Sequence, residues 1–145
     1  MTAPIVILSD YGMGAGTAAV KGVCKTFAPQ SHVFELSSDI PALNLDAADV
    51  LCAGMQAWPE GTVFLNLVDN GEKGRRQAVV TTKDGYIVVS PDNKVLAAVE
   101  AARGTAEKRD VSDLAACYGA EYEKTALCHG RDLAYVAAKA AAKEL

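Results

Sequence analysis

The 145-residue sequence lacks the features that mark several large classes of protein. No apolar run approaches the roughly 18 residues that a membrane-spanning helix needs, so no membrane partner is expected. No positively charged stretch precedes the first apolar segment, so no signal peptide is expected. The formal net charge is −4 and no basic stripe stands out, which argues against a nucleic-acid partner. Together these absences predict a cytoplasmic globular protein.

Common binding and catalytic motifs are also missing. There is no phosphate-binding G-x-x-x-x-G-K-[ST] loop, no G-x-S-x-G nucleophile turn and no H-E-x-x-H zinc motif. The glycine-rich loop 12–16 lacks the third glycine of a dinucleotide fingerprint, because Thr17 stands in its place. With only two histidines, a histidine-based metal centre is not expected, and no metal is predicted. The four cysteines are Cys24, Cys52, Cys117 and Cys128. Without C-x-x-C spacing, they fit small buried apolar residues better than redox or zinc ligands.

What is present is typical of a single globular domain. Half of the residues are apolar and 22% are charged, and a chain of this length is one domain by the usual size of domains. Apolar spacing predicts strands at 5–8, 33–36 and 63–68, a hairpin at 77–82 and 86–90, and an edge strand at 105–111. It also predicts helices at 17–27, 44–56 (with Asn44 as N-cap), 94–102 (with Asn93 as cap) and 131–143. The order predicts a single α/β domain over residues 1–145, a three-layer sandwich with a mainly parallel central sheet.

The most informative stretch runs from Val63 to Arg76. An apolar strand, broken only by Asn66, ends at Asp69, and a glycine-containing turn leads to Arg75 and Arg76. Ligands of open α/β sheets bind outside the carboxyl ends of the strands, so an acid and a guanidinium here predict a functional site. The alternative is an ordinary surface turn with a solvated charge cluster.

Three further positions carry functional side chains near predicted strand or helix ends: Asp10, Asn93 and His129. Asp10 either contacts a ligand or is a helix-cap or turn residue. His129 precedes a predicted helix whose N-terminus points N–H donors toward it. An Asp–Arg–His set can orient and polarise a water molecule. The alternative for His129 is a simple helix cap beside a first-turn salt bridge between Arg131 and Asp132.

Eight short segments together carry a resemblance to a known family. They are SDYG at 9–12, VKGV at 20–23, SDIP at 38–41, WPEGTV at 58–63, VDNG at 68–71, RR at 75–76, PDN at 91–93 and HGRD at 129–132. In this order and spacing, the set resembles the N-terminal domain of the S-adenosylmethionine (SAM) hydroxide adenosyltransferases, relatives of the SAM-dependent chlorinases and fluorinases.

The resemblance implies hydrolysis of SAM, or of a related adenosyl compound, to adenosine and methionine by attack of water on the ribose 5′ carbon. It places the water-handling residues at Asp69, Arg75 and His129, with Arg76 as an alternative to Arg75. In the halogenating relatives, the position of Asp69 is not an acid and the histidine is absent, so these two residues favour water over halide.

The resemblance also implies substrate contacts. Asp10 would hold the ribose hydroxyls, Asn93 would belong to the nucleoside pocket, and the loop containing Leu43 would lie against the substrate. No cofactor is expected, since SAM itself is the substrate. Lys94 stands where the family usually has glycine.

Members of this family carry a second, β-rich domain that helps to close the pocket across a trimer interface. The resemblance therefore implies a homo-oligomer, a trimer, in which another subunit or chain completes the site. The alternative is a non-catalytic SAM- or nucleoside-binding protein that lost turnover with the second domain.

Overall fold

The computed structural model describes residues 2–41, 44, 47–69, 75–114 and 128–145. Within them the strands are β1 (Ile5–Leu8), β2 (Val33–Ser37), β3 (Val63–Asn66), β4 (Gln77–Thr82), β5 (Ile87–Pro91) and β6 (Thr105–Asp110). The helices are α1 (Ala15–Phe27), α2 (Ala48–Met55), α3 (Lys94–Arg103) and α5 (Cys128–Ala141).

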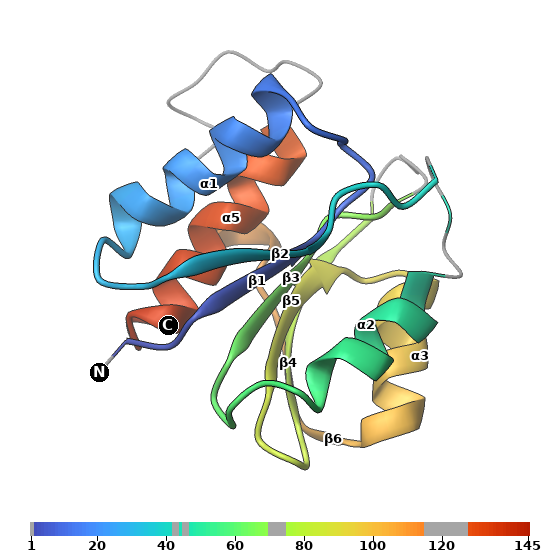
Figure 1. The fold of residues 1–145 in the computed structure, drawn as a ribbon. Helices are drawn as coiled ribbons and strands as arrows, with labels where there is room; N and C mark the ends of the chain where they lie inside the picture. Colours follow the sequence, from blue (N-terminus) through green and yellow to red (C-terminus); the bar gives the residue numbers. More distant parts are fainter. Residues whose placement is uncertain (1, 42–43, 45–46, 70–74, 115–127) are drawn as a thin grey trace.

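The strands form one sheet in the order β2-β1-β3-β5-β4-β6 (Figure 1). The pairs β1–β2, β1–β3 and β3–β5 are parallel, whereas β4 pairs antiparallel with both β5 and β6. The predicted hairpin and the polar edge strand β6 are confirmed. The mainly parallel central sheet is also confirmed.

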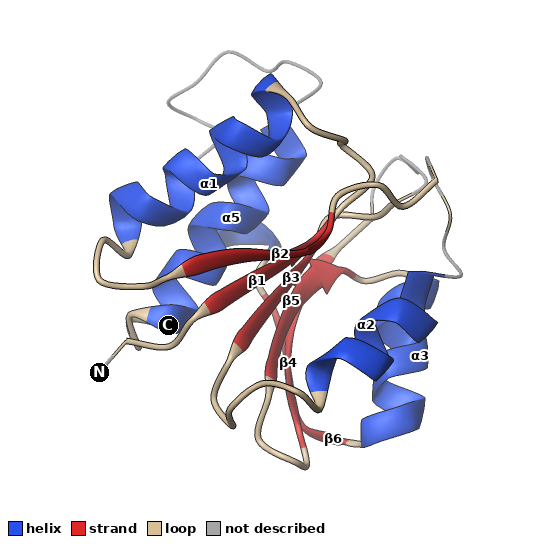
Figure 2. Ribbon diagram, viewed as in Figure 1, coloured by secondary structure: helices blue, strands red, loops and turns tan. Residues whose placement is uncertain are grey.

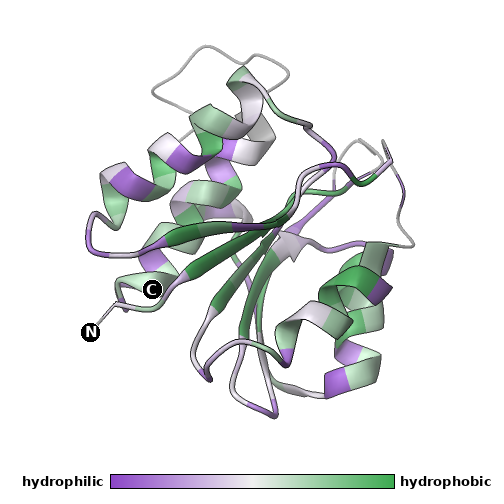
Figure 3. Ribbon diagram, viewed as in Figure 1, coloured by the Kyte–Doolittle hydropathy of each residue, from purple (hydrophilic) through white to green (hydrophobic). Residues whose placement is uncertain are grey.

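Helices cover both faces of this sheet, with α1 and α5 on one side and α2 and α3 on the other (Figure 2). Alternation along β1 shows why two cores form: Ile5 and Ile7 pack toward α1 and α5, while Val6 and Leu8 pack toward α2 and α3. Because both faces are covered, the central strands are mostly apolar, and β1 is apolar at every position (Figure 3). The predicted three-layer α/β sandwich is confirmed.

The helix predicted at 44–56 is shorter than expected. It begins at Ala48 with Ala47 as its N-cap, so the prediction of Asn44 as the cap is wrong. The Asn44 backbone instead takes part in tight turns: its N–H donates to the Pro41 carbonyl, and its carbonyl accepts from the Ala47 N–H.

The central strand β3 also ends early, at Asn66 rather than at Val68. The Val68 N–H donates to Oδ1 of Asn66, so a side chain replaces the next backbone acceptor of the ladder. The Leu67 N–H still donates to the Leu8 carbonyl, which keeps the segment beside β1.

Two helix ends differ in how well the sequence indicated them. Helix α3 is capped by Asn93 and ends at Gly104, which has φ +73°, as predicted. Helix α5 begins at Cys128 instead of residue 131, so that Gly130 lies inside its first turn. None of the helices in the described ranges is both long and apolar enough to cross a membrane.

Candidate functional site

Three of the predicted site residues lie on segments that follow adjacent strands, at the carboxyl ends of those strands. Register pairs Leu8 of β1 with Asn66 of β3, and Leu65 of β3 with Val89 of β5. These three strands are parallel neighbours, so the segments that follow them start side by side. Asp10, Asp69 and Asn93 lie on those three segments, as the sequence predicted.

Asp69 and Arg75 form an ion pair at this edge. The Arg75 Nε lies 3.0 Å from Oδ1 of Asp69, and both side chains are largely covered, with 15% and 25% exposed for Arg75 and Asp69. The guanidinium also donates from Nη1 to the Asp92 carbonyl at 3.0 Å. It therefore joins the segments that follow β3 and β5.

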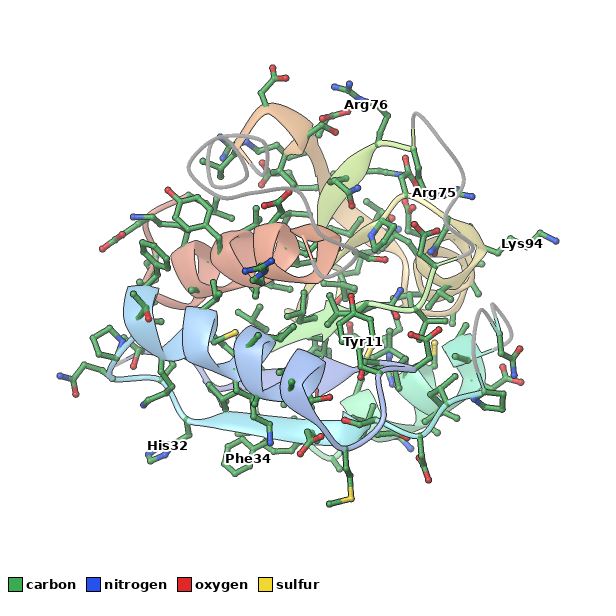
Figure 4. All side chains as sticks on the ribbon, turned by 90° about the horizontal axis from the view of Figure 1, so that it is seen from above. Tyr11, His32, Phe34, Arg75, Arg76 and Lys94 are labelled. Atoms are coloured by element: carbon green, nitrogen blue, oxygen red, sulfur yellow. The ribbon has the colours of Figure 1, made fainter. Side chains whose placement is uncertain are left out.

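The neighbouring Arg76 points elsewhere. It makes a two-point contact with Asp110 at the end of β6, with Nε–Oδ2 at 2.8 Å and Nη2–Oδ1 at 3.1 Å. Both side chains are exposed, 61% and 49%. The Arg76 guanidinium holds the pKa of the Asp110 carboxyl well below its usual range. The structure thus brings Arg75, and not Arg76, to Asp69. Figure 4 shows the two arginine side chains lying apart.

Asn93 lies beside this pair and is nearly buried, with 6% exposed. Its Oδ1 accepts from the N–H groups of Val95 and Leu96 and so caps α3. Its Nδ2 donates to the Val68 carbonyl at 2.8 Å and reaches Oδ1 of Asp69 at 3.5 Å. Asn93 therefore connects the start of α3 to the segment that carries Asp69.

Asn66 and Ser90 form a buried polar floor beneath the site. Both are fully buried, and Nδ2 of Asn66 donates to the Ser90 hydroxyl at 3.0 Å. Asn66 also accepts from the Val68 N–H, which fixes the turn that leads to Asp69. This pair was not predicted as part of the site. A single asparagine inside a buried apolar run was the signal for it, because buried polar side chains need partners.

Asp10 follows β1 on a loop that is tied to its neighbours. The Ser9 N–H donates to Ser37 and the Gly12 N–H donates to Ser38, at 2.9 and 2.7 Å, which couples this loop to the end of β2. The Thr17 hydroxyl donates to the Gly12 carbonyl and anchors the loop to α1. Asp10 is itself half-buried.

Tyr11 is a site residue that sequence reasoning missed. Burial, followed by the charges of Asp10 and Asp69, raises the pKa of Tyr11 from 10.0 to about 12, so its hydroxyl stays neutral at physiological pH. A Cβ atom at Gly130 would lie 2.5 Å from the Tyr11 hydroxyl oxygen. Tyr11 thus lies against the first turn of α5 and feels the charge of both acids. Its position between an acid and a glycine after a strand was the available signal.

The structure leaves two of the predicted residues without a described side chain. Leu43 lies outside the described residues. The backbone of His129 belongs to the first turn of α5, next to Gly130, but its side chain is outside the described part of the chain. The Tyr11–Gly130 contact places that turn beside the Tyr11 ring.

A groove of about 290 Å³ lies elsewhere, between β4, β6 and the end of α5, and Arg109 and Lys143 line it. Of the predicted site residues whose side chains the structure describes, none lines this groove. Among the described residues, no three His, Cys, Asp or Glu side chains gather as a metal-binding group would. The strand ends therefore define the candidate site.

The strand-end arrangement suits proton transfer from a small polar molecule. A carboxylate accepts a proton, and a guanidinium bound to it fixes its orientation. The neutral Tyr11 hydroxyl is a further hydrogen-bonding group nearby.

Comparison with known proteins places the chain in one family. A family model described as the SAM hydroxide adenosyltransferase N-terminal domain matches residues 5–145. A relative from Methanocaldococcus jannaschii, named (R)-S-adenosyl-L-methionine hydrolase, is 25% identical over 135 residues, which cover 89% of this chain and 49% of the relative. A relative of the same name from Thermus thermophilus is 36% identical over 92 residues, covering 62% of this chain and 36% of the relative.

Solved structures with a similar fold are also known. The crystal structure of an uncharacterized conserved protein from Thermotoga maritima superposes with a TM-score of 0.86 at 32% identity, covering 95% of this chain and 53% of the other. The crystal structure of a conserved hypothetical protein from Thermus thermophilus gives 0.76 at 28% identity, covering 97% and 54%. The chain thus spans about half of these structures and at most half of the curated relatives it matches.

Proposed function

Because the chain belongs to the family of SAM hydroxide adenosyltransferase N-terminal domains, we propose that it hydrolyses SAM to adenosine and methionine. The observation that carries the proposal is the Asp69–Arg75 ion pair at the carboxyl end of the central strand β3. A protein that only bound a nucleoside would not need an oriented carboxylate there.

The reaction joins the oxygen of water to the ribose 5′ carbon. The bond from that carbon to sulfur breaks, and its electron pair stays on sulfur, which leaves as the neutral thioether of methionine. The proton that water loses passes to Asp69 or His129 and then to solvent. Because a sulfonium is already a good leaving group, the reaction needs neither a cofactor nor a metal.

The protein's task is then to position the nucleophile and exclude competing water. In the proposal, Arg75 fixes Asp69, and Asp69 and His129 orient the attacking water. Strong anionic stabilisation at sulfur would favour the ground state, because positive charge disappears there as the bond breaks. Placing the acid at the oxygen nucleophile avoids this penalty.

Substrate binding is proposed for residues around this pair. Asp10 lies at the end of the neighbouring strand β1, where its carboxylate would accept from the two ribose hydroxyls. Leu43 would contact the substrate from the segment after β2. The names of the relatives specify the R configuration at sulfur, and we extend that preference to this chain.

The chain spans about half of its relatives, so the remaining walls of the pocket are proposed to come from another subunit or chain. A homotrimer is the assembly we propose, by resemblance to the family. The same observation favours one alternative, a SAM- or nucleoside-binding protein without turnover.

Incubating the purified protein with each sulfonium epimer of SAM, followed by chromatography, separates these functions. Hydrolysis yields adenosine and methionine in equal amounts. Asp69→Asn and His129→Ala should abolish most of the release, whereas His32→Ala, which removes the other histidine, should not. Binding of SAM without product identifies the non-catalytic alternative. Release of methylthioadenosine would show a different cleavage at the sulfonium.

A further inference from the structure

The side-chain amide of Asn93 is fully engaged within the protein. A primary amide offers two N–H donors and a carbonyl oxygen with two acceptor positions. Both acceptor positions serve the N–H groups of Val95 and Leu96, at 3.0 and 3.3 Å. The donors reach the Val68 carbonyl at 2.8 Å and Asp69 at 3.5 Å. This leaves the amide no further group for a nucleoside.

The surrounding groups also fix which way the amide faces. Two backbone N–H groups at the start of α3 require an acceptor, so the oxygen must point toward the helix. The Val68 carbonyl requires a donor, so the nitrogen must point toward the end of β3. Flipping the amide would oppose like groups on both sides.

Contacts around Asn93 close into a ring. Arg75 contacts Oδ1 of Asp69 at 3.0 Å and donates to the Asp92 carbonyl at 3.0 Å; Asp92 is bonded to Asn93, and Asn93 reaches the same Oδ1. We call Asp69, Arg75, Asp92 and Asn93 the polar ring. One oxygen thus carries two contacts, the ion pair with Arg75 and a long hydrogen bond from Asn93. Together they restrict the rotation of the carboxylate, and hence the direction of its second oxygen.

We propose that Asn93 is a positioning residue that orients the Asp69 carboxylate through the polar ring, instead of a ligand of the nucleoside. This inference rests on the proposed function, because it states how the acid of that reaction is held in place. It also reassigns Asn93 from the nucleoside-pocket role that the family resemblance implied.

Three variants separate its two structural tasks. Asn93→Ser keeps a cap for α3, because a serine hydroxyl caps about as well as asparagine, but removes the donor toward Asp69. Asn93→Ala removes both, and its Tm should be about 2–4 °C lower than that of Asn93→Ser. Lys94→Ala is the matched control, since this neighbouring side chain is exposed and points away from the body of the protein (Figure 4).

Turnover and binding should respond differently. Asn93→Ser should lower kcat for SAM about 10- to 100-fold, the loss that small misplacements of catalytic groups produce. Its Kd for adenosine, measured by calorimetry, should stay within about twofold of wild type, because the amide does not touch the nucleoside. Lys94→Ala should leave kcat unchanged. An adenosine Kd that weakens in step with kcat would overturn the proposal, and so would an unchanged kcat.

A spectroscopic readout keeps this test separate from that of the proposed function. If wild type releases no adenosine from SAM, the proposed function fails, and the polar ring is then tested by the ¹⁵N NMR signal of the Arg75 Nε–H group. Asn93→Ser should shift that signal and speed its exchange with water, whereas Lys94→Ala should do neither. A signal that is identical in wild type and Asn93→Ser would contradict the positioning role.

Discussion

Arg75 and Arg76 are adjacent in the chain, yet they serve different regions of the molecule. Arg75 lies where the parallel strands β1, β3 and β5 end, covered and in contact with Asp69 and the Asp92 carbonyl. Arg76 lies on the antiparallel side, exposed and in contact with Asp110 at the end of β6. Each arginine has an acid at about 3 Å, so contact distance alone does not distinguish them.

The difference lies in what surrounds each pair. The Asp69–Arg75 pair is joined to Asn93, the α3 cap and the buried Asn66–Ser90 floor, so its geometry is over-determined. The Arg76–Asp110 pair is surrounded by solvent, where ion pairs contribute little. The ion pair at the ends of the parallel strands is therefore covered and fixed by several contacts, whereas the ion pair on the antiparallel side is exposed to solvent.

The largest expected contrast comes from removing each acid. Asp69→Asn should lower kcat/KM for SAM about 10²- to 10⁴-fold, the usual contribution of a proton-accepting group. Asp110→Asn, an identical change in the other pair, should leave kcat/KM within about twofold, since surface pairs contribute little. Chromatographic assay of adenosine release measures both. Equal losses in the two variants would erase the distinction between the regions.

The arginines should differ next. Arg75→Lys keeps the charge but loses the planar fork that reaches Asp69 and the Asp92 carbonyl together, so kcat should fall about 10- to 100-fold. Arg76→Lys should retain wild-type kcat and wild-type Tm. Steady-state kinetics decide this, and a loss confined to Arg76→Lys would assign the site to the other arginine.

A pair of glycine substitutions tests the packing at the site end against an open surface. Gly130→Ala forces a methyl group to 2.5 Å from the Tyr11 hydroxyl and should lower the free energy of unfolding by about 1–3 kcal/mol. Gly22 lies in α1, where an added Cβ would meet no atom of another element within 4 Å. Gly22→Ala should therefore raise the free energy of unfolding by about 0.4–1 kcal/mol. Urea denaturation measures both. Adding Tyr11→Phe to Gly130→Ala should restore part of the lost free energy of unfolding. A Gly130→Ala variant as stable as wild type would contradict the contact between Gly130 and the Tyr11 hydroxyl.

The smallest effect concerns alkaline pH. The folded-state pKa of Tyr11 is raised from 10.0 to about 12, so its stabilising contribution is complete below pH 10 and is lost as pH rises toward 12. Tyr11→Phe should therefore lose less stability than wild type between pH 10 and 12. Thermal denaturation across that range checks the sign, and parallel curves would show that Tyr11 is not shielded.

The sequence predicted the architecture well because periodicity reports burial directly. The runs at β1 and β3 are apolar at every position but Asn66, since helices cover both faces. The Asn93 cap and the Gly104 stop were also predictable, as they depend on local backbone chemistry. Asn44 and the start of α5 were misread, because tertiary contacts decide them: Gly130 is poor in an isolated helix but allows Tyr11 to approach.

The candidate site was predictable only in part. That Asp10, Asp69 and Asn93 share one edge follows from parallel strands. The choice of Arg75 over Arg76 does not, since it depends on where each side chain lies as the chain enters β4. Tyr11 was missed for a similar reason: its neighbours Asp69 and Gly130 are remote in sequence, and only the fold brings them together.

Hydrolysis of SAM in water enriched in ¹⁸O tests most directly whether the strand-end site delivers water to the ribose. We expect mass spectrometry to show the heavy oxygen at the 5′ hydroxyl of the released adenosine and none in methionine. Asp69→Asn should release almost no labelled adenosine. Adenosine without the label, or equal labelling rates in wild type and Asp69→Asn, would contradict a water-handling role for the Asp69–Arg75 pair.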